Sequence, residues 1–202
     1  MPQASTQSFL PIETIKNQTI ILRNGGMRAL LLCSSINFGL LTPDEQDAIE
    51  WQYQNFLNSL DFNIQILVIS RKMNIQNYLK ELEGLVEKQE NELLALQAEG
   101  YIKFISSLSE MVNLMSKNFY IIVPIHPDTS KEKLLDPKSD EEFMRWKGQL
   151  DERVSYIMEG VRRTGVRCIQ LNDEEIKELL WQYFNPKEAE SGTIPVFSND
   201  LK

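Results

Sequence analysis

The chain has 202 residues, 42% of them hydrophobic and 25% charged, which is ordinary for a globular protein large enough to bury a core. Its formal net charge of −8 argues against direct nucleic-acid binding, because a protein that holds phosphates needs an excess of Lys and Arg. No apolar stretch is long enough to span a bilayer, and the N-terminus lacks a signal-peptide pattern. We therefore expect neither a transmembrane helix nor a signal peptide.

The N-terminal part of the chain predicts a β-hairpin. Residues 1–8 are polar and expected to be flexible, and residues 9–15 lead into a strand over 18–23 and a second strand over 28–33. The connection Asn24-Gly25-Gly26 supplies residues that tolerate positive φ, which tight hairpin turns require. No Gly-Lys-Ser/Thr follows these glycines, so they form a corner and not a phosphate-binding loop.

A helix and a third strand follow. Thr42 can cap a helix, Pro43 suits its first position and Glu45 completes a capping box, so we expect a helix over about 43–60. Residues 62–70 are rich in β-branched and apolar side chains and predict the third strand.

The longest helical pattern runs from about residue 75 to residue 116. Unbroken, such a helix would extend for roughly 60 Å. Gly84 and Gly100 each cost about 1 kcal/mol relative to alanine, and Gly100 is the expected bend. Because a helix of this length cannot pack along one domain, part of it is expected to project or to meet another chain.

The C-terminal part alternates strands and helices. The expected elements are a strand over 119–123, a polar insertion over 126–142, a helix over 140–164, a strand over 166–171, a helix over 172–184 and a linker-like tail over 185–202, in which 194–197 could add a short edge strand. The order predicts a single α/β (α+β) domain over 9–184, with a mixed, largely antiparallel sheet of about five strands, helices on one side and one long, projecting helix.

No catalytic, cofactor or metal site is predicted from the residues. His126, the only histidine, has no neighbours at metal-ligand spacing and is expected on a surface loop. Cys33 and Cys168 lie in apolar strand-like runs and are expected to be free, buried thiols in a reducing compartment. The basic cluster of Arg162, Arg163 and Arg167 is expected to lie near a helix end, where it contacts carbonyls and carboxylates.

Several short stretches in a fixed order carry a resemblance. They are Ser34-Ser35-Ile36-Asn37-Phe38, Glu45-Gln46-Asp47, the segments 56–62 and 89–94, Gln65-Ile66 with Ser70-Arg71, Met115-Ser116-Lys117 and the segment 119–124. Over residues 5–125, and more loosely over 165–183, the chain resembles the TraC-like domain family. The resemblance implies the N-terminal part of conjugative, type IV secretion ATPases, which docks the motor at the inner membrane beside small membrane subunits and neighbouring copies.

In full-length relatives a motor with Walker motifs follows this domain. Here the sequence reaches Lys202 without a Walker lysine, so the resemblance does not extend to ATP hydrolysis. The leading hypothesis is a non-catalytic docking component without cofactors, cytoplasmic and peripheral to the inner membrane. Its expected partners are a separate motor ATPase, a small inner-membrane subunit and further copies of itself. The alternatives are a small-molecule- or nucleotide-binding enzyme with a scattered site and a regulatory stand-alone copy of the ATPase domain.

Apolar residues of the long helical pattern form the candidate partner surface, together with any open edge of the sheet. These residues are Leu93, Leu96, Phe104, Met111 and Met115. They cannot all face one compact core, which favours a partner. In the competing interpretation a bend at Gly100 folds the helix back and buries them all.

Overall fold

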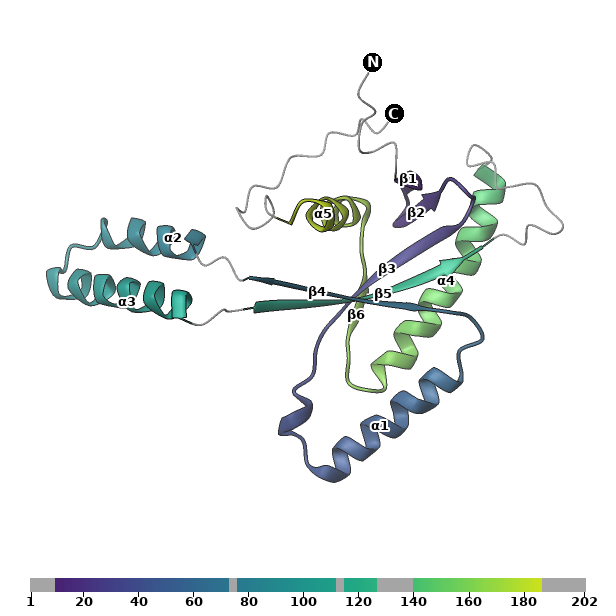
Figure 1. Ribbon diagram of the computed structural model, residues 1–202, viewed down its shortest axis with the longest axis horizontal. Coiled ribbons are helices and arrows are strands. Elements are labelled where there is room, and N and C mark those ends of the chain that lie inside the picture. Colours follow the sequence, from purple (N-terminus) through teal and green to yellow (C-terminus); the bar gives the residue numbers. More distant parts are fainter. Residues whose placement is uncertain (1–9, 73–75, 112–114, 127–139, 187–202) are drawn as a thin grey trace, which may run out of the picture. The chain divides into compact units, whose positions relative to one another are not determined.

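The computed structural model describes residues 10–72, 76–111, 115–126 and 140–186 (Figure 1). The described strands are β1 (Ile12–Lys16), β2 (Thr19–Leu22), β3 (Met27–Cys33), β4 (Gln65–Lys72), β5 (Met115–Ile125) and β6 (Cys168–Gln170). The described helices are the 3₁₀-helix η2 (Phe38–Leu40), α1 (Pro43–Asn58), α2 (Gln76–Val86), α3 (Glu92–Met111), α4 (Asp140–Arg162) and α5 (Asp173–Phe184).

These strands form one sheet in the order β1-β2-β3-β5-β4, and β6 also pairs with β3. The predicted α+β class with a largely antiparallel sheet is therefore confirmed. Among the described residues the sheet has six strands, because residues 12–16 form a strand that the sequence pattern did not predict. The expected strand over 194–197 lies outside the described residues, as do 1–8, most of the 126–142 insertion and most of the tail.

The chain divides into two compact units. The first comprises residues 1–68, 118–180 and 197–202, and the second comprises 69–117 and 181–196. Nearly all of the sheet pairing described below, with helices α1 and α4, belongs to the first unit. Helices α2 and α3 belong to the second. A single domain over 9–184 stays a prediction.

The predicted corner at Asn24-Gly25-Gly26 is confirmed. Gly25 has a φ of 78°, and the Leu22 N–H donates to the Gly26 carbonyl at 2.8 Å. The Asn24 side-chain oxygen accepts from the Gly26 N–H at 3.0 Å. Strands β2 and β3 leave this turn as an antiparallel pair. The glycines thus serve backbone geometry, as expected of residues with access to positive φ.

Strand β3 is the centre of the sheet. One of its edges pairs with β5 along its whole length, from Met27 opposite Ile125 to Cys33 opposite Phe119. Its other edge pairs with β2 near Met27 and with β6 near Cys33. Because both edges and both faces are covered, its sequence is a nearly continuous apolar run and does not alternate with polar residues.

The two faces of the sheet carry different helices. On one face, alternate residues of β3 pack in a single cluster with Phe56 of α1 and with residues of α4 that include Leu150 and Ile157. Leu30 points to the opposite face and is buried there, and Ile176 of α5 is buried outside the cluster. Figure 1 shows α5 on the other side of the strands from α1.

The expectation of helices on one side is therefore wrong. Apolar residues recur in α5 as they do in α1 and α4, and this periodicity does not tell which face of a sheet a helix covers.

The long helical pattern over about 75–116 is broken, but not at the expected bend, Gly100. The chain leaves α2 after Val86 and re-enters a helix at Glu92, so the break lies over 87–91 and Gly100 sits inside α3. Asn91 caps α3: its carbonyl accepts from Ala95, and its side-chain oxygen accepts from the Leu93 and Leu94 N–H groups at 3.0 and 3.4 Å. A run of six polar residues over 87–92 marks the break in the sequence.

Replacing Asn91 by alanine tests this hairpin. Loss of the cap should destabilise the start of α3 by about 1 kcal/mol. In a continuous helix the same change would be stabilising, because alanine is the better helix former. Hydrogen exchange of the Leu93 and Leu94 amides measures the difference, with Gln97→Ala in the exposed middle of α3 as the control. Slower exchange in Asn91→Ala would contradict the hairpin.

Replacing Gly160 of α4 by alanine tests the packing of α4 on α1. A Cβ at this position would lie 2.3 Å from Cδ2 of Phe56, whereas a Cβ at Gly148 of the same helix meets nothing within 4 Å. Gly160→Ala should therefore lower the free energy of unfolding by about 1–3 kcal/mol through overpacking. Gly148→Ala should raise it by about 0.5–1 kcal/mol through helix propensity.

Denaturant unfolding of both variants gives the sign directly. Shortening the facing side chain in a Phe56→Leu background should remove most of the penalty at Gly160. Equal stabilisation by the two alanine substitutions would show that α1 does not pack against Gly160 in solution.

Candidate interaction surface

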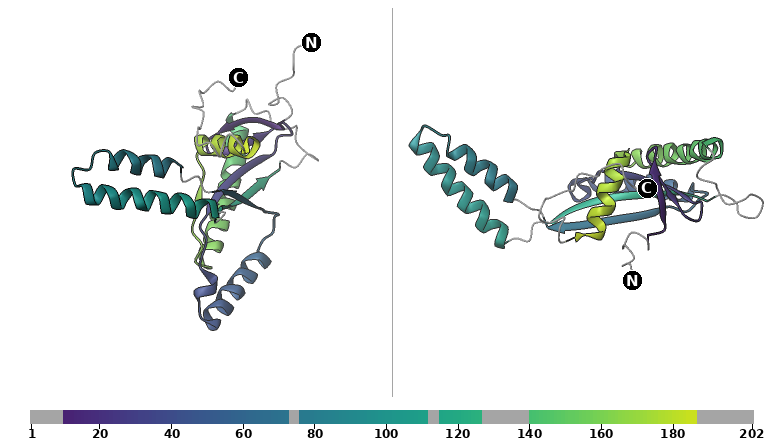
Figure 2. Two further views of the ribbon diagram at one scale, coloured as in Figure 1. Left: turned by 60° about the vertical axis from the view of Figure 1, so that its left-hand side comes forward. Right: turned by 90° about the horizontal axis from the view of Figure 1, so that it is seen from above.

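Helices α2 and α3 pack side by side as a helical hairpin (Figure 2). Leu79 of α2 is buried, at 5% exposure, and Leu82 and Val86 beside it are half-buried. In α3, Ala95, Ala98, Ile102 and Ile105 are half-buried. These positions recur at spacings of three and four residues in each helix, which is the pattern of one packed helix face.

The opposite face of α3 is apolar and exposed. Leu93 is 77% exposed, Leu96 67% and Phe104 59%. We call these three residues the α3 stripe. At 100° per residue they lie within about 80° of one another and roughly opposite Ile102. Among the side chains that the structure describes, those of α2 therefore do not cover the stripe.

The sequence-predicted partner surface is brought together only in part. Leu93, Leu96 and Phe104 share the α3 stripe. Met111 ends the helix, and its side chain lies outside the described residues. Met115 is 48% exposed but is the first residue of β5 and does not continue the helix. The predicted bend at Gly100, which would have buried all five, is absent from α3.

Sequence reasoning missed several other exposed apolar residues of the hairpin. They are Leu94 and Tyr101 on α3 and Tyr78 and Leu85 on α2, each between 46% and 59% exposed. A side-chain hydrogen bond with Tyr101 raises the pKa of Tyr78, which ties the two helices together near one end. Large apolar side chains gathered on one element are typical of an interaction surface.

The charge of the hairpin restricts what it can bind. Residues 76–111 contain seven glutamates and three lysines, and no arginine or aspartate. An anionic membrane surface attracts basic segments, so this acidic hairpin is poorly suited to lipid headgroups. A protein surface with an apolar centre and a basic rim would complement it.

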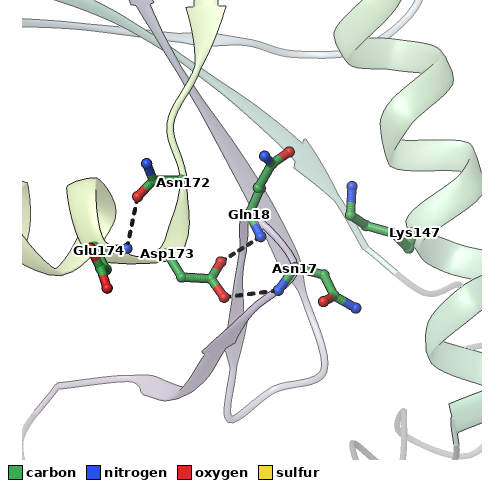
Figure 3. A pocket seen from close by; sticks show the side chains of 6 residues that line it. All are labelled: Asn17, Gln18, Lys147, Asn172, Asp173 and Glu174. Atoms are coloured by element: carbon green, nitrogen blue, oxygen red, sulfur yellow. Dashed lines mark hydrogen bonds between the residues drawn. The ribbon is translucent and has the colours of Figure 1, made fainter. Parts of the chain in front are cut away.

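A shallow hollow of about 620 Å³ lies elsewhere, in the first unit, where α5 begins (Figure 3). The carboxylate of Asp173 accepts hydrogen bonds from the Asn17 and Gln18 N–H groups, at 3.1 and 2.5 Å. Both acceptor oxygens are thus engaged in holding the β1–β2 turn, and Lys147 pairs with Asp151. This geometry makes Asp173 a structural anchor between the start of α5 and the β1–β2 turn.

His126 lies at the end of β5 beside two arginines. Its Nε2 is 2.8 Å from Nη2 of Arg28, and because a guanidinium only donates, Nε2 accepts and the ring is neutral. Partial burial and the positive charges of Arg28 and Arg153 lower the pKa of His126. The residue is exposed, as the sequence predicted, but it is engaged with Arg28.

Three further features were considered from the sequence: a metal site, a basic cluster and a membrane-spanning segment. Within the described ranges, no three His, Cys, Asp or Glu side chains are placed to hold a metal ion together. The cluster of Arg162, Arg163 and Arg167 is exposed at and just after the end of α4. None of the helices described here is long and apolar enough to cross a membrane.

The model of the archaeal TraC-like domain family matches residues 13–186 of this chain. The match spans the whole pattern of strands and helices from β1 to α5, including the α2–α3 hairpin. No curated protein matches, and no solved structure does.

The pKa of His126 can be tested by NMR titration of this single histidine. We expect a pKa below 6.5, and replacement of Arg28 by glutamine should raise it, because the positive charge beside the ring is removed. Arg162→Gln is the control, since that arginine is not among the charges that act on His126.

The lowered pKa of His126 determines how the stability of the fold changes with pH. Above about pH 6.5 the ring is neutral in both states, whereas below it the unfolded chain takes up the proton first. The contribution of His126 to stability is therefore lost as the pH falls through its folded-state pKa. A titration midpoint above 6.5 in the wild-type chain would contradict the contact with Arg28.

Proposed function

Because the chain belongs to the archaeal TraC-like domain family, we propose that it is a non-catalytic docking component of a type IV secretion or conjugative transfer apparatus. The family relates it to the N-terminal domains of conjugation and secretion ATPases. In this role the chain is peripheral to the inner membrane and lies beside a small membrane subunit. It positions a separate motor ATPase there.

The α3 stripe is the observation that supports a docking role. Three large apolar side chains, each more than half exposed, share one helix face that α2 does not cover. Burying such a side chain in an interface contributes about 1.5–3 kcal/mol. The stripe can therefore anchor a partner as the centre of an interface.

The composition of the hairpin favours a protein as the partner. Its excess of glutamates disfavours anionic lipid and suits a basic rim on the partner. We assign the stripe to the motor ATPase, and self-association or contact with the membrane subunit becomes an outcome of the test. ATP hydrolysis in the assembled apparatus then belongs to residues outside this sequence.

Two glutamate substitutions in the stripe test the assignment. Leu93→Glu together with Phe104→Glu should weaken binding to the secretion ATPase of the same organism at least tenfold, because each charge would be buried without a partner. The matched control is Leu40→Glu with Met144→Glu, which changes the charge equally at side chains 84% and 63% exposed in the first unit. Isothermal titration calorimetry measures both, and circular dichroism checks that both variants fold.

Equal weakening by the control pair would show a general charge effect and would contradict the stripe as the docking surface. A concentration series in light scattering separates self-association, which should vanish in the stripe variant if copies use the same surface. Release of phosphate from ATP by the purified wild-type chain would refute the non-catalytic role.

A further inference from the structure

We propose that Cys33 and Cys168 form a dithiol that closes to an intramolecular disulfide across strands β3 and β6. The proposal is independent of the docking role. Cys33 and Cys168 are the only two cysteines in the chain, so no other intramolecular pairing competes. Both belong to the first compact unit.

The register of the two strands places the cysteines directly opposite each other. Cys33 is the last residue of β3 and Cys168 the first of β6, and they are partners in the antiparallel ladder. The backbone of Ser34 donates to Arg167 at 2.8 Å, and that of Leu171 donates to Leu30 at 2.9 Å. Because hydrogen-bonded and non-hydrogen-bonded pairs alternate, Cys33 and Cys168 form a non-hydrogen-bonded pair.

That kind of pair suits a disulfide. Opposite Cα atoms in it are about 4.5 Å apart, which lies within the range of about 4.4–6.8 Å that disulfides span. The two sulfurs already face each other at 2.9 Å, less than 1 Å longer than the ~2.05 Å bond. Bond formation therefore requires only a small shift of the two side chains.

The environments of the two thiols differ. Cys33 belongs to the core cluster and is 9% exposed, whereas Cys168 is half-buried at its margin. The hydrogen bond between the thiols lowers the pKa of Cys168 and, with burial, raises that of Cys33. Cys168 is thus the more accessible thiol and the one that reaches the thiolate form first.

The reaction needs an oxidant, and a low-molecular-weight disulfide is sufficient. The Cys168 thiolate attacks one sulfur of this oxidant, forms a mixed disulfide and releases one small thiolate. Cys33 then gives up its proton and attacks the Cys168 sulfur, which expels the second small thiolate. The two protein thiols lose two electrons, and the small disulfide gains them as two thiols.

The bond would fasten a weakly held strand. β6 has three residues and joins α4 to α5, and its pairing is with β3. A link between positions 135 residues apart also constrains the unfolded chain over a long loop. Oxidation should therefore stabilise the first unit. The redox state of the compartment decides which form is populated.

The test uses the wild-type chain with oxidised glutathione as the probe. We expect both thiols to disappear, the intact mass to fall by two hydrogen atoms, and peptide mapping to join the Cys33 and Cys168 peptides. The Tm should rise by roughly 5–15 °C and return on reduction. Pulsed alkylation of the reduced chain should label Cys168 about tenfold faster than Cys33.

Cys168→Ala and Cys33→Ala are the controls, and their Tm should be the same in oxidising and reducing buffer. Thiols that persist in excess oxidised glutathione, a stable glutathione adduct on one cysteine, or bonds only between chains would each overturn the proposal. A cross-link that leaves the Tm unchanged or lowers it would also overturn it, because the sulfurs would then meet only in a distorted fold.

Discussion

The arrangement of the first unit depends on the complete covering of strand β3. Its Met27–Cys33 run has β5 on one edge and both β2 and β6 on the other. Its two faces are buried under different helices, so nearly every side chain of the strand leaves water. Burial of that much apolar surface is the main favourable term in folding such a unit. The other elements of this unit are positioned by the edge or the face of β3 that each of them covers.

Long-range polar contacts then fix the elements at the margin of the sheet. Asn17 and Gln18 turn with φ values of 51° and 61°, a conformation that non-glycine residues adopt at a cost. Asp173, at the start of α5, accepts hydrogen bonds from both of their N–H groups. The N-terminal hairpin and the last helix are thus joined, although more than 150 residues separate them. Strand β6, which directly precedes α5 in the chain, brings Cys168 opposite Cys33.

The second unit follows a different physical rule. Its helices bury one face against each other and leave the α3 stripe exposed. A helical hairpin of this size has little core, and a second apolar face on it costs solubility without adding stability. A partner that covers the stripe explains why such side chains occur there, which is the basis of the docking role proposed above.

Local signals in the sequence predicted most elements correctly. The capping residues at Thr42 and Asn172 gave the starts of α1 and α5, and the glycine turn gave the β2–β3 hairpin. Strand β1 was missed because its turn contains no glycine and depends on Asp173, which is remote in sequence. The α2–α3 break was missed because glycine was given more weight than the polar run and the cap at Asn91.

The sequence by itself determined most of the element types, the α+β class and the family resemblance, because caps, turns and apolar periodicity act over a few residues. Only the tertiary structure decided that α5 covers the second face, that Asp173 holds the first turn, that Cys33 faces Cys168, and which side of α3 stays exposed. The reason is that strand register and face selection depend on which distant surfaces bury each other, and no local pattern encodes that choice.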